Sequence, residues 1–451
     1  MSRLRYLGVP LTTLGLRRLN VGRGMPGPTL LFRLDNMGNV TGSGDMSNGR
    51  TSTAYIQEYD GALTPTLANE IRYARGRRVD HADATMYNAG VLGIEYLDTE
   101  SDGTTLISPP PAMLHERAGT NNFFHSNDIS NAAWNKTGLD TVVANELVPT
   151  VASSNNFFNK DLTVLGSTRY TQTYYVKPNG YNYLQITGSL GFSSGNLINY
   201  ELTGAGTITW KPLPATGASI ELLDNGWYKI IASMDTLGPG TARMLVSVLP
   251  SDIQSRLPNV VGDGSGIFCN YCQTEQSPYS SSYMASGSSN GTRTIDTIQN
   301  DAIANWDNTK GIAFLEFTPL YDSDTTAMGL FNTTNAVAGV FSDSATAGTV
   351  SSEDGTNTAS TNLTSWVAGD TVKLALVFDS VAGSMEIASQ KNAGAWSSWV
   401  SSSYDGAFPL STDLHWMFGL TETAEIIDTR IYNTLYNETI AASKTWVEAN
   451  L

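Results

Sequence analysis

Aromatic and β-branched runs joined by short turns constrain the fold of this chain more than any other feature. Residues 170–177 read Tyr-Thr-Gln-Thr-Tyr-Tyr-Val-Lys, a strand pattern, and Pro-Asn-Gly at 178–180 leads into a returning strand over 181–187. A second pair, 219–223 and 227–233, is joined by Asp-Asn-Gly, which is typical of a hairpin. In its last strand, Trp227, Lys229 and Ile231 alternate with Tyr228, Ile230 and Ala232. Both faces carry bulk, so we predict a strand covered on both sides in a β-sandwich.

The composition supports several domains with a weakly charged surface. The 451 residues suggest two to four domains, and only 15% are charged, against a typical quarter. Ser, Thr, Asn and Gly must therefore build the polar surface, which suits all-β proteins and partners such as sugars. The net charge of −16 argues against a nucleic-acid partner for the whole chain.

The first 33 residues differ from the rest, since they hold six arginines and no acidic residue. One interpretation is a solvated or lightly structured basic tail. The other is a docking arm for an acidic partner surface, irregular apart from a strand near 29–34. The candidate docking residues are Arg3, Arg5, Arg17, Arg18 and Arg23.

The predicted fold class is all-β, with tandem β-sandwiches, an irregular N-terminal arm and a short C-terminal helix. We divide the chain into an arm (1–49), a connector of short strands (50–118), a first sandwich (119–296) and a second sandwich (297–451). Strands of the second sandwich are expected over 311–318, 371–378, 384–388, 415–420 and 424–432. A helix is expected over 437–449, with Asn437 as its cap.

Cys269 and Cys272 are the two cysteines, spaced C-x-x-C. Such a pair can be redox-active or half of a zinc site. No second cysteine pair exists and the four histidines are scattered, so two buried free thiols are the favoured interpretation. Residues 267–272 read as a strand, in which residues three apart point to opposite faces.

The sequence contains no motif that identifies an enzyme or a cofactor site, and we predict neither. Phosphate-loop, dinucleotide, metalloprotease and G-x-S-x-G patterns are absent. Asp322 and Asp324, with Asp343 or Glu353 and Asp354, can form a calcium cluster, an acid pair or, most simply, turns. No signal peptide is visible and no apolar run approaches the ~20 residues of a membrane span. We therefore expect synthesis in a cytoplasm and no membrane insertion.

Exposed aromatic side chains are the better functional lead, because sugar rings stack on them. The stretch 394–406 is rich in Ser and Gly and holds Trp396, Trp399 and Tyr404, followed by Asp405. These four residues are the candidate glycan-binding site. The alternative is a strand pair whose tryptophans pack inward, and Trp134 is open to the same two interpretations.

Several segments, in order, resemble a signature of bacteriophage tail-fibre and head-spike proteins. They include Ser-Asn-Ala-Ala-Trp-Asn-Lys-Thr at 130–137, Thr-Tyr-Tyr-Val-Lys at 173–177, Asp-Asn-Gly-Trp-Tyr-Lys at 224–229 and Gln-Thr-Glu at 273–275. The resemblance covers about residues 50–296 and implies a carbohydrate-module-like jelly roll. Residues 297–451 resemble a concanavalin-A-like (laminin-G type) sandwich, through Phe-Leu-Glu-Phe at 314–317 and Arg-Ile-Tyr-Asn-Thr at 430–434.

The resemblance implies a non-enzymatic virion protein on the particle surface, a fibre- or spike-type adhesin. We expect a homotrimer whose N-terminal arm docks on portal, tail or capsid proteins and whose sandwiches recognise host-surface polysaccharide, with avidity multiplying weak contacts. A capsid decoration or tail-assembly protein without a receptor is the alternative. A glycan depolymerase, which needs two carboxylates facing one groove, is the third hypothesis.

Overall fold

The computed structural model describes the chain in segments. They are residues 30–33, 46–48, 52–57, 63–66, 72–74, 77–80, 94–97, 112–116, 118–140, 145–152, 154–192, 196–211, 217–223, 226–252, 255–294, 296, 298–300, 309–319, 329–332, 338–342, 349–354, 356–362, 369–405, 415–416, 429–437 and 444–450.

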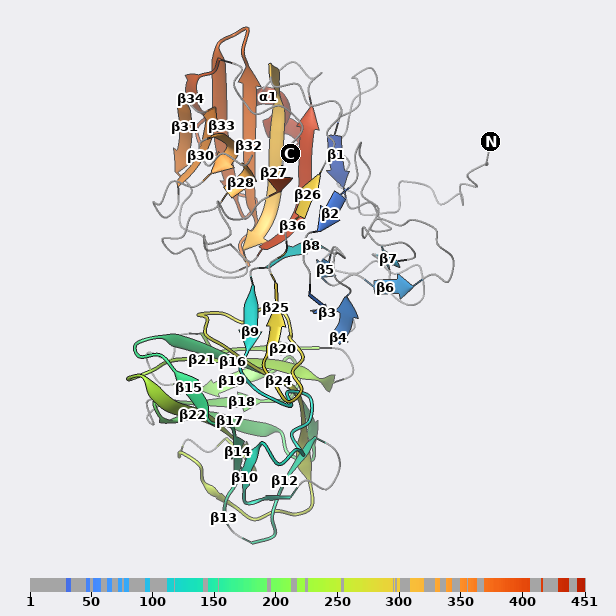
Figure 1. Ribbon diagram of the computed structural model, residues 1–451, viewed down its shortest axis with the longest axis vertical. Coiled ribbons are helices and arrows are strands. Elements are labelled where there is room, and N and C mark those ends of the chain that lie inside the picture. The colour runs from blue at the N-terminus through green and yellow to red at the C-terminus, as the bar shows by residue number, and fades with distance from the viewer. Residues whose placement is uncertain are drawn as a thin grey trace, which may run out of the picture. The chain divides into compact units, whose positions relative to one another are not determined.

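The protein is all-β and forms two compact units (Figure 1). Unit 2 comprises residues 50–68 and 118–295, and unit 1 comprises residues 1–49, 69–117 and 296–451. The segment 50–118 is thus shared between both units. Every named strand pair in the described segments is antiparallel, so the sheets are built from hairpins and longer returns.

Unit 2 contains two large sheets. One has the order β11 (Leu139–Asp140), β12 (Glu146–Pro149), β24 (Gly266–Glu275), β16 (Arg169–Asn179), β21 (Tyr228–Asp235) and β20 (Ser219–Leu222). The other has the order β10 (Asn135–Thr137), β14 (Phe157–Asn159), β22 (Gly240–Leu249), β17 (Tyr183–Leu190), β18 (Leu197–Glu201) and β19 (Thr207–Trp210), and β15 (Leu162–Val164) also pairs with β22. Two-stranded pairs are β3 (Ala54–Gln57) with β4 (Leu63–Thr66), β9 (Gly119–Asn121) with β25 (Gly291–Arg293), and β13 (Ser154–Asn155) with β23 (Asn259–Val260).

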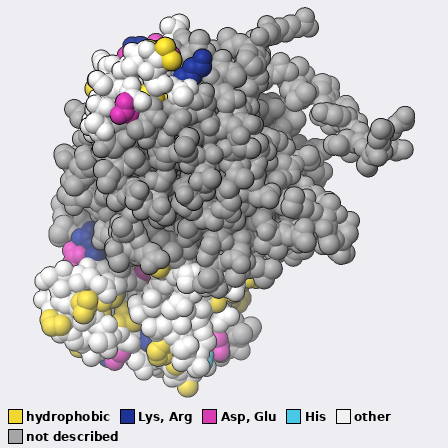
Figure 2. Space-filling view, turned by 45° about the horizontal axis from the view of Figure 1, so that its top comes forward, with side chains coloured by type: hydrophobic (Ala, Val, Ile, Leu, Met, Phe, Trp, Pro, Cys, Tyr) yellow, Lys and Arg dark blue, Asp and Glu magenta, His cyan; other side chains and the backbone are white. Residues whose placement is uncertain are grey.

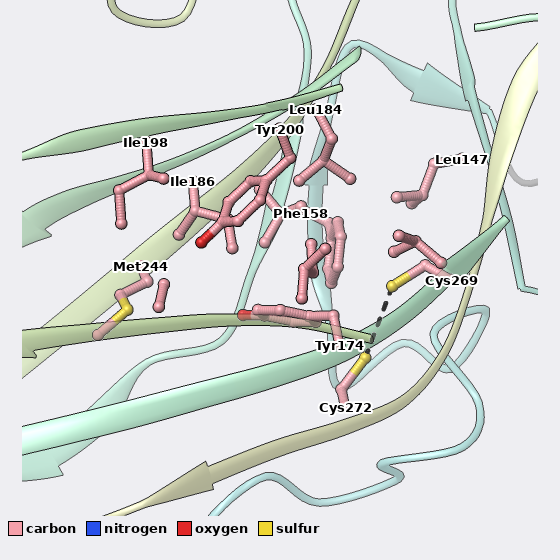
Figure 3. Packing of buried hydrophobic residues seen from close by; sticks show 14 of the residues in the cluster. Leu147, Phe158, Tyr174, Leu184, Ile186, Ile198, Tyr200, Met244, Cys269 and Cys272 are labelled. Carbon is pink, nitrogen blue, oxygen red and sulfur yellow. Dashed lines mark hydrogen bonds between the residues drawn. The ribbon is translucent and has the colours of Figure 1, made fainter. Parts of the chain in front are cut away.

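Side chains of both large sheets meet in one core, which makes unit 2 a β-sandwich. Its centre is aromatic: edge-on contacts join Phe123 to Trp134 at 5.0 Å, Trp134 to Phe158 at 5.5 Å and Phe158 to Tyr174 at 5.9 Å between ring centroids. Figure 3 shows Phe158 and Tyr200 of one sheet beside Tyr174 of the other. Trp134 is 3% exposed, so it is a core residue and not part of a glycan-binding surface.

The hairpin of β20 and β21 is confirmed, with Leu222 opposite Tyr228. The strands over 170–187 are present as β16 and β17, but they do not pair with each other. β16 pairs with β21 and β24, while β17 pairs with β18 and β22 in the other sheet. The turn at 178–180 therefore carries the chain between the two sheets.

Of the two faces of β21, which were both predicted to be covered, one is partly exposed. Tyr228, Ile230 and Ala232 are buried in the core, whereas Trp227, Lys229 and Ile231 are partly exposed. One face of this strand packs against the opposite sheet, and the other is covered only in part.

Unit 1 also contains two large sheets. One has the order β34 (Val400–Ser403), β33 (Ser384–Lys391), β32 (Val372–Asp379), β27 (Lys310–Pro319), β36 (Thr429–Asn437), β8 (Ala112–His115) and β5 (Arg72–Ala74), with β1 (Leu30–Arg33) also paired to β36. The other has the order β2 (Met46–Asn48), β26 (Ile298–Asn300), β35 (His415–Trp416), β28 (Gly329–Asn332), β29 (Ala338–Ser342), β30 (Thr349–Asp354) and β31 (Thr358–Asn362). β6 (Arg77–Asp80) pairs with β7 (Ile94–Leu97).

The two ends of the chain are partly as expected. The strand predicted near 29–34 is β1, and its pairing of Leu31 with Leu435 makes it part of the unit 1 sheet. The short C-terminal helix is α1 (Lys444–Asn450), but Asn437 is the last residue of β36 and does not cap it. Pairing of β36 with β27 holds residues 429–437 extended, which moves the helix start seven residues along the chain. Within the described segments, no helix has the length and hydropathy that crossing a bilayer requires.

Candidate functional site

Trp396 and Trp399, two of the predicted glycan-binding residues, lie together in unit 1. Their rings stack at 6.5 Å between centroids with an interplanar angle of 17°, and both side chains are partly exposed. They also pack against an apolar cluster on one face of the β27–β32 sheet, made of Ile312, Phe314, Ala375, Val377 and Val447. The pair therefore covers the sheet beside α1 as well as facing solvent.

Polar contacts fix this arrangement. Trp399 donates its Nε1–H to Glu448 Oε1 of α1 at 2.8 Å, and Lys444 Nζ lies 2.6 Å from Glu386 Oε1 of β33. The indole edge of Trp399 is thus occupied by the protein itself. Its ring is part of the packing that holds α1.

Tyr404 and Asp405 do not join the tryptophans in one surface. Tyr404 is 2% exposed and meets Phe378 edge-on at 5.5 Å between centroids. Phe378 follows Val377 along β32, so the two side chains point to opposite faces of the sheet. Tyr404 therefore packs on the face opposite the tryptophan pair, while Asp405 is exposed.

The remaining predicted positions lie outside the described residues. These are the docking arginines Arg3, Arg5, Arg17, Arg18 and Arg23 and the calcium candidates Asp322 and Asp324. Across the segments that the structure does describe, no group of three or more His, Cys, Asp or Glu side chains is placed to hold a metal ion.

A second surface with binding character lies on unit 2, over β17, β18 and β19. Leu184 and Ile186 of β17 and Ile198 and Tyr200 of β18 point into the core. The residues between them face the other way. We call this surface the β18 face and define it by Tyr183, Asn199, Glu201, Thr209, Trp210 and Asp252.

Asp252 is held by neutral donors on this face. Its Oδ1 accepts hydrogen bonds from Asn199 Nδ2 at 3.1 Å and from Thr209 Oγ1 at 2.8 Å. Glu201 is held in the same way, because its Oε1 accepts from the Tyr183 hydroxyl at 3.1 Å and from Thr203 Oγ1 at 2.9 Å. The bond to Glu201 raises the pKa of the Tyr183 phenol above its ordinary value.

Neither carboxylate of the β18 face forms an ion pair with a described residue. Each has one oxygen, Oε2 or Oδ2, that receives none of these bonds. An ionised carboxylate is an acceptor only, and bonds to it are stronger than bonds to neutral acceptors. The face therefore presents two oriented acceptors suited to hydroxyl or amide donors.

Trp210 supplies the apolar part of the β18 face. It ends the edge strand β19, where a register irregularity places it opposite Asn199, and 37% of it is exposed. An exposed indole beside oriented carboxylates combines a stacking surface with polar acceptors. On the described part of unit 2, Figure 2 shows scattered yellow hydrophobic side chains on a surface that is mostly white, the colour of uncharged polar side chains and of the backbone.

Residues 255–257 are fixed against the β18 face. Gln185 is fully buried and donates from Nε2 to Asn199 Oδ1 at 3.0 Å and to the Ser255 carbonyl at 3.1 Å. Its Oε1 accepts from Leu257 N at 2.8 Å. Gln185 thereby joins residues 255–257 to the strand that carries Asn199.

Sequence reasoning missed this site because its residues come from three strands and a loop. A local signal existed at 207–210, Thr-Ile-Thr-Trp, which alternates like a strand ending in an exposed tryptophan. The spacing between Trp210 and Asp252 gave no indication that both are joined to Asn199. Comparisons with protein-family models and with curated proteins find no match to this chain.

Proposed function

We propose that the chain is a non-enzymatic bacteriophage virion protein, a fibre- or spike-type adhesin on the particle surface that recognises host polysaccharide. The observation that carries the binding part is the β18 face, which combines Trp210 with the oriented carboxylates of Glu201 and Asp252. The resemblance of residues 50–296 supports the virion part. Docking through the N-terminal arm and a homotrimeric state belong to the same proposal.

The chemistry of the β18 face suits the binding of a sugar without any reaction. Sugar hydroxyls donate to fixed carboxylate oxygens, and the C–H face of a pyranose packs on an indole. Neutral donors within the protein orient both carboxylates before any ligand binds, which lowers the entropic cost of binding. Only 15% of the residues are charged, so few cationic side chains compete with a sugar for the two carboxylates.

Binding of the purified full chain to a panel of bacterial surface polysaccharides tests this proposal. We expect saturable binding to at least one polysaccharide, weakened in Glu201→Gln and Asp252→Asn, with no new reducing ends. Release of reducing ends would favour the depolymerase hypothesis. Absence of binding across polysaccharides from a susceptible host would remove the adhesin role.

One observation favours the alternative of an assembly role. Leu165, Leu190 and Leu237 are 56%, 56% and 71% exposed in unit 2, Leu190 at the end of β17 and the other two on loops. The loops are joined by bonds from Leu237 N to Gly191 O and from Thr236 Oγ1 to Leu165 O. Exposed apolar patches mark protein contacts. Imaging of the particle separates the roles: sandwiches buried between subunits indicate assembly, and sandwiches projecting into solvent indicate adhesion.

A further inference from the structure

Cys269 and Cys272 meet inside unit 2. Their Sγ atoms are 3.8 Å apart, both residues are fully buried, and neither is in a disulfide. Figure 3 shows the two sulfurs pointing toward each other beside Tyr174. The expectation of two buried free thiols is confirmed, but the expectation that they point to opposite faces is wrong.

A β-bulge brings the two side chains to the same face. Cys269 lies opposite Val176 and Asn270 opposite Tyr175, but the register then shifts, and Gln273 lies opposite Thr173. Two residues of β24, Tyr271 and Cys272, therefore face the single residue Tyr174. The extra residue reverses the alternation, so Cys272 returns to the core face that Cys269 occupies.

The bulge is held by the structure around it. Tyr271 has a φ of 49°, a left-handed conformation that is costly for a side chain of this size. Its ring makes edge contacts with Tyr175 at 5.8 Å and with Tyr283 at 5.1 Å between centroids. Cys272 N donates to the Ser126 carbonyl at 2.7 Å. Packing on the outer side thus fixes the geometry that places the thiols in contact.

This geometry suits a bond between the sulfurs better than a zinc site. A structural zinc ion takes four ligands, and among the described residues no third His, Cys, Asp or Glu joins the two thiols. A disulfide needs only these two atoms, which must close from 3.8 Å to about 2.05 Å.

We propose that Cys269 and Cys272 form a latent disulfide site, reduced in the folded protein and closed by thiol–disulfide exchange with a low-molecular-weight disulfide such as oxidised glutathione. One cysteine thiolate attacks a glutathione sulfur, forming a mixed disulfide and releasing one glutathione thiolate. The second cysteine thiolate attacks the first cysteine's sulfur and releases the second glutathione. The protein loses two electrons and two protons, and one oxidised glutathione accepts them to become two reduced glutathione molecules.

Access controls the rate of this step. Burial raises the pKa of the Cys272 thiol well above its ordinary value, which disfavours the thiolate that must attack. Glutathione also cannot reach fully buried sulfur atoms. Exchange therefore proceeds through opening of β24, and the second attack is fast because the partner thiol is already in contact.

The test incubates the reduced full-length protein with excess oxidised glutathione at neutral pH, with and without urea below the unfolding transition. Samples are quenched in acid, alkylated after denaturation, and mapped by mass spectrometry. We expect both thiols to disappear together, yielding a peptide that has lost two hydrogens. We also expect the rate to rise with urea and to level off as the glutathione concentration increases.

Cys269→Ala and Cys272→Ala serve as matched variants. Each retains one thiol and should accumulate the mixed glutathione disulfide that the wild type does not. The wild-type measurement needs no variant, so it remains decisive if a variant fails to fold. A persistent glutathione adduct in the wild type, or two free thiols after prolonged opening in urea, would overturn the proposal. The outcome does not depend on the proposed adhesin function.

Discussion

Asn199 Nδ2 donates a 3.1 Å hydrogen bond to Asp252 Oδ1, which joins a buried strand residue to an exposed loop residue. The same Asn199 accepts a bond from Gln185. A chain of amide and carboxylate groups thus runs from inside the sheet to the surface of the β18 face. Its effect is to hold one acceptor in place before a ligand arrives.

Replacement of Gln185 tests this series of hydrogen bonds. Gln185→Ala leaves the Leu257 amide without its acceptor and removes the bond to Asn199 Oδ1, and a buried group left unpaired costs about 1–3 kcal/mol. We expect urea denaturation to show a loss of about 2 kcal/mol, and hydrogen exchange to rise at 255–257. Thr203→Ala, at an exposed residue, should change neither. Unaltered exchange in Gln185→Ala would contradict the role of this residue in fixing the loop.

Tyr200 ties the two sheets of unit 2 together. Its hydroxyl donates to the Ile231 carbonyl of the facing sheet at 2.6 Å, and burial raises the pKa of this phenol well above its ordinary value. Tyr200→Phe should lower the free energy of unfolding by about 1–2 kcal/mol, because the hydrogen bond between the two sheets is lost. Tyr183→Phe, at a partly exposed residue, is the matched control and should cost less. Equal effects of the two variants would count against the inter-sheet bond.

Trp399 should matter for stability as well as for any contact with a ligand. It packs on the cluster around Phe314 and bonds Glu448, so Trp399→Ala should destabilise unit 1 by roughly 2 kcal/mol, about half the cost of a fully buried tryptophan. Glu448→Gln retains an acceptor oxygen and should cost much less. Thermal unfolding of the full chain measures both. A Trp399→Ala protein as stable as the wild type would show that the packing of this ring does not stabilise unit 1.

Glu275 gives unit 2 a pH dependence of known sign. It is buried beside Ser281 and Gln273, and its desolvation raises its pKa above the ordinary 4.5. The folded state therefore holds this proton more tightly than the unfolded chain, so the contribution of Glu275 is fully present below 4.5 and is lost as pH rises through the folded pKa. Relative to Glu275→Gln, the wild type should gain stability as pH falls from neutral, in urea titrations at several pH values. A relative loss would contradict the sign.

Local pattern predicted the strands but not their partners. The alternation in 170–177, 311–318 and 371–378 is that of β16, β27 and β32, because side chains of a strand in a sandwich must alternate. Nothing local indicates that 178–180 passes between sheets, since a Pro-Asn-Gly turn is compatible with either route. Which strands pair depends on how the apolar faces of all the strands are buried together, and a short segment does not contain that information.

The bulge and the β18 face depend on long-range partners. Cys269 and Cys272 share a face because β16 and the tyrosines outside β24 accommodate an extra residue, which spacing along one strand does not reveal. Trp210 and Asp252 meet through Asn199, on another strand. Trp396 and Trp399 were found from composition, whereas the burial of Tyr404 follows from its contact with Phe378.

The most direct test of the central claim compares polysaccharide affinity in two aromatic variants. Trp210 and Phe124 are each 37% exposed, but Phe124 lies over Lys160 near β14, three strands from β18 in the sheet order. For the polysaccharide that the wild type binds, the account predicts that Trp210→Ala raises Kd by about tenfold, the equivalent of about 1.4 kcal/mol, while Phe124→Ala leaves it unchanged. An unchanged Kd in Trp210→Ala, or an equal loss in both variants, would contradict it.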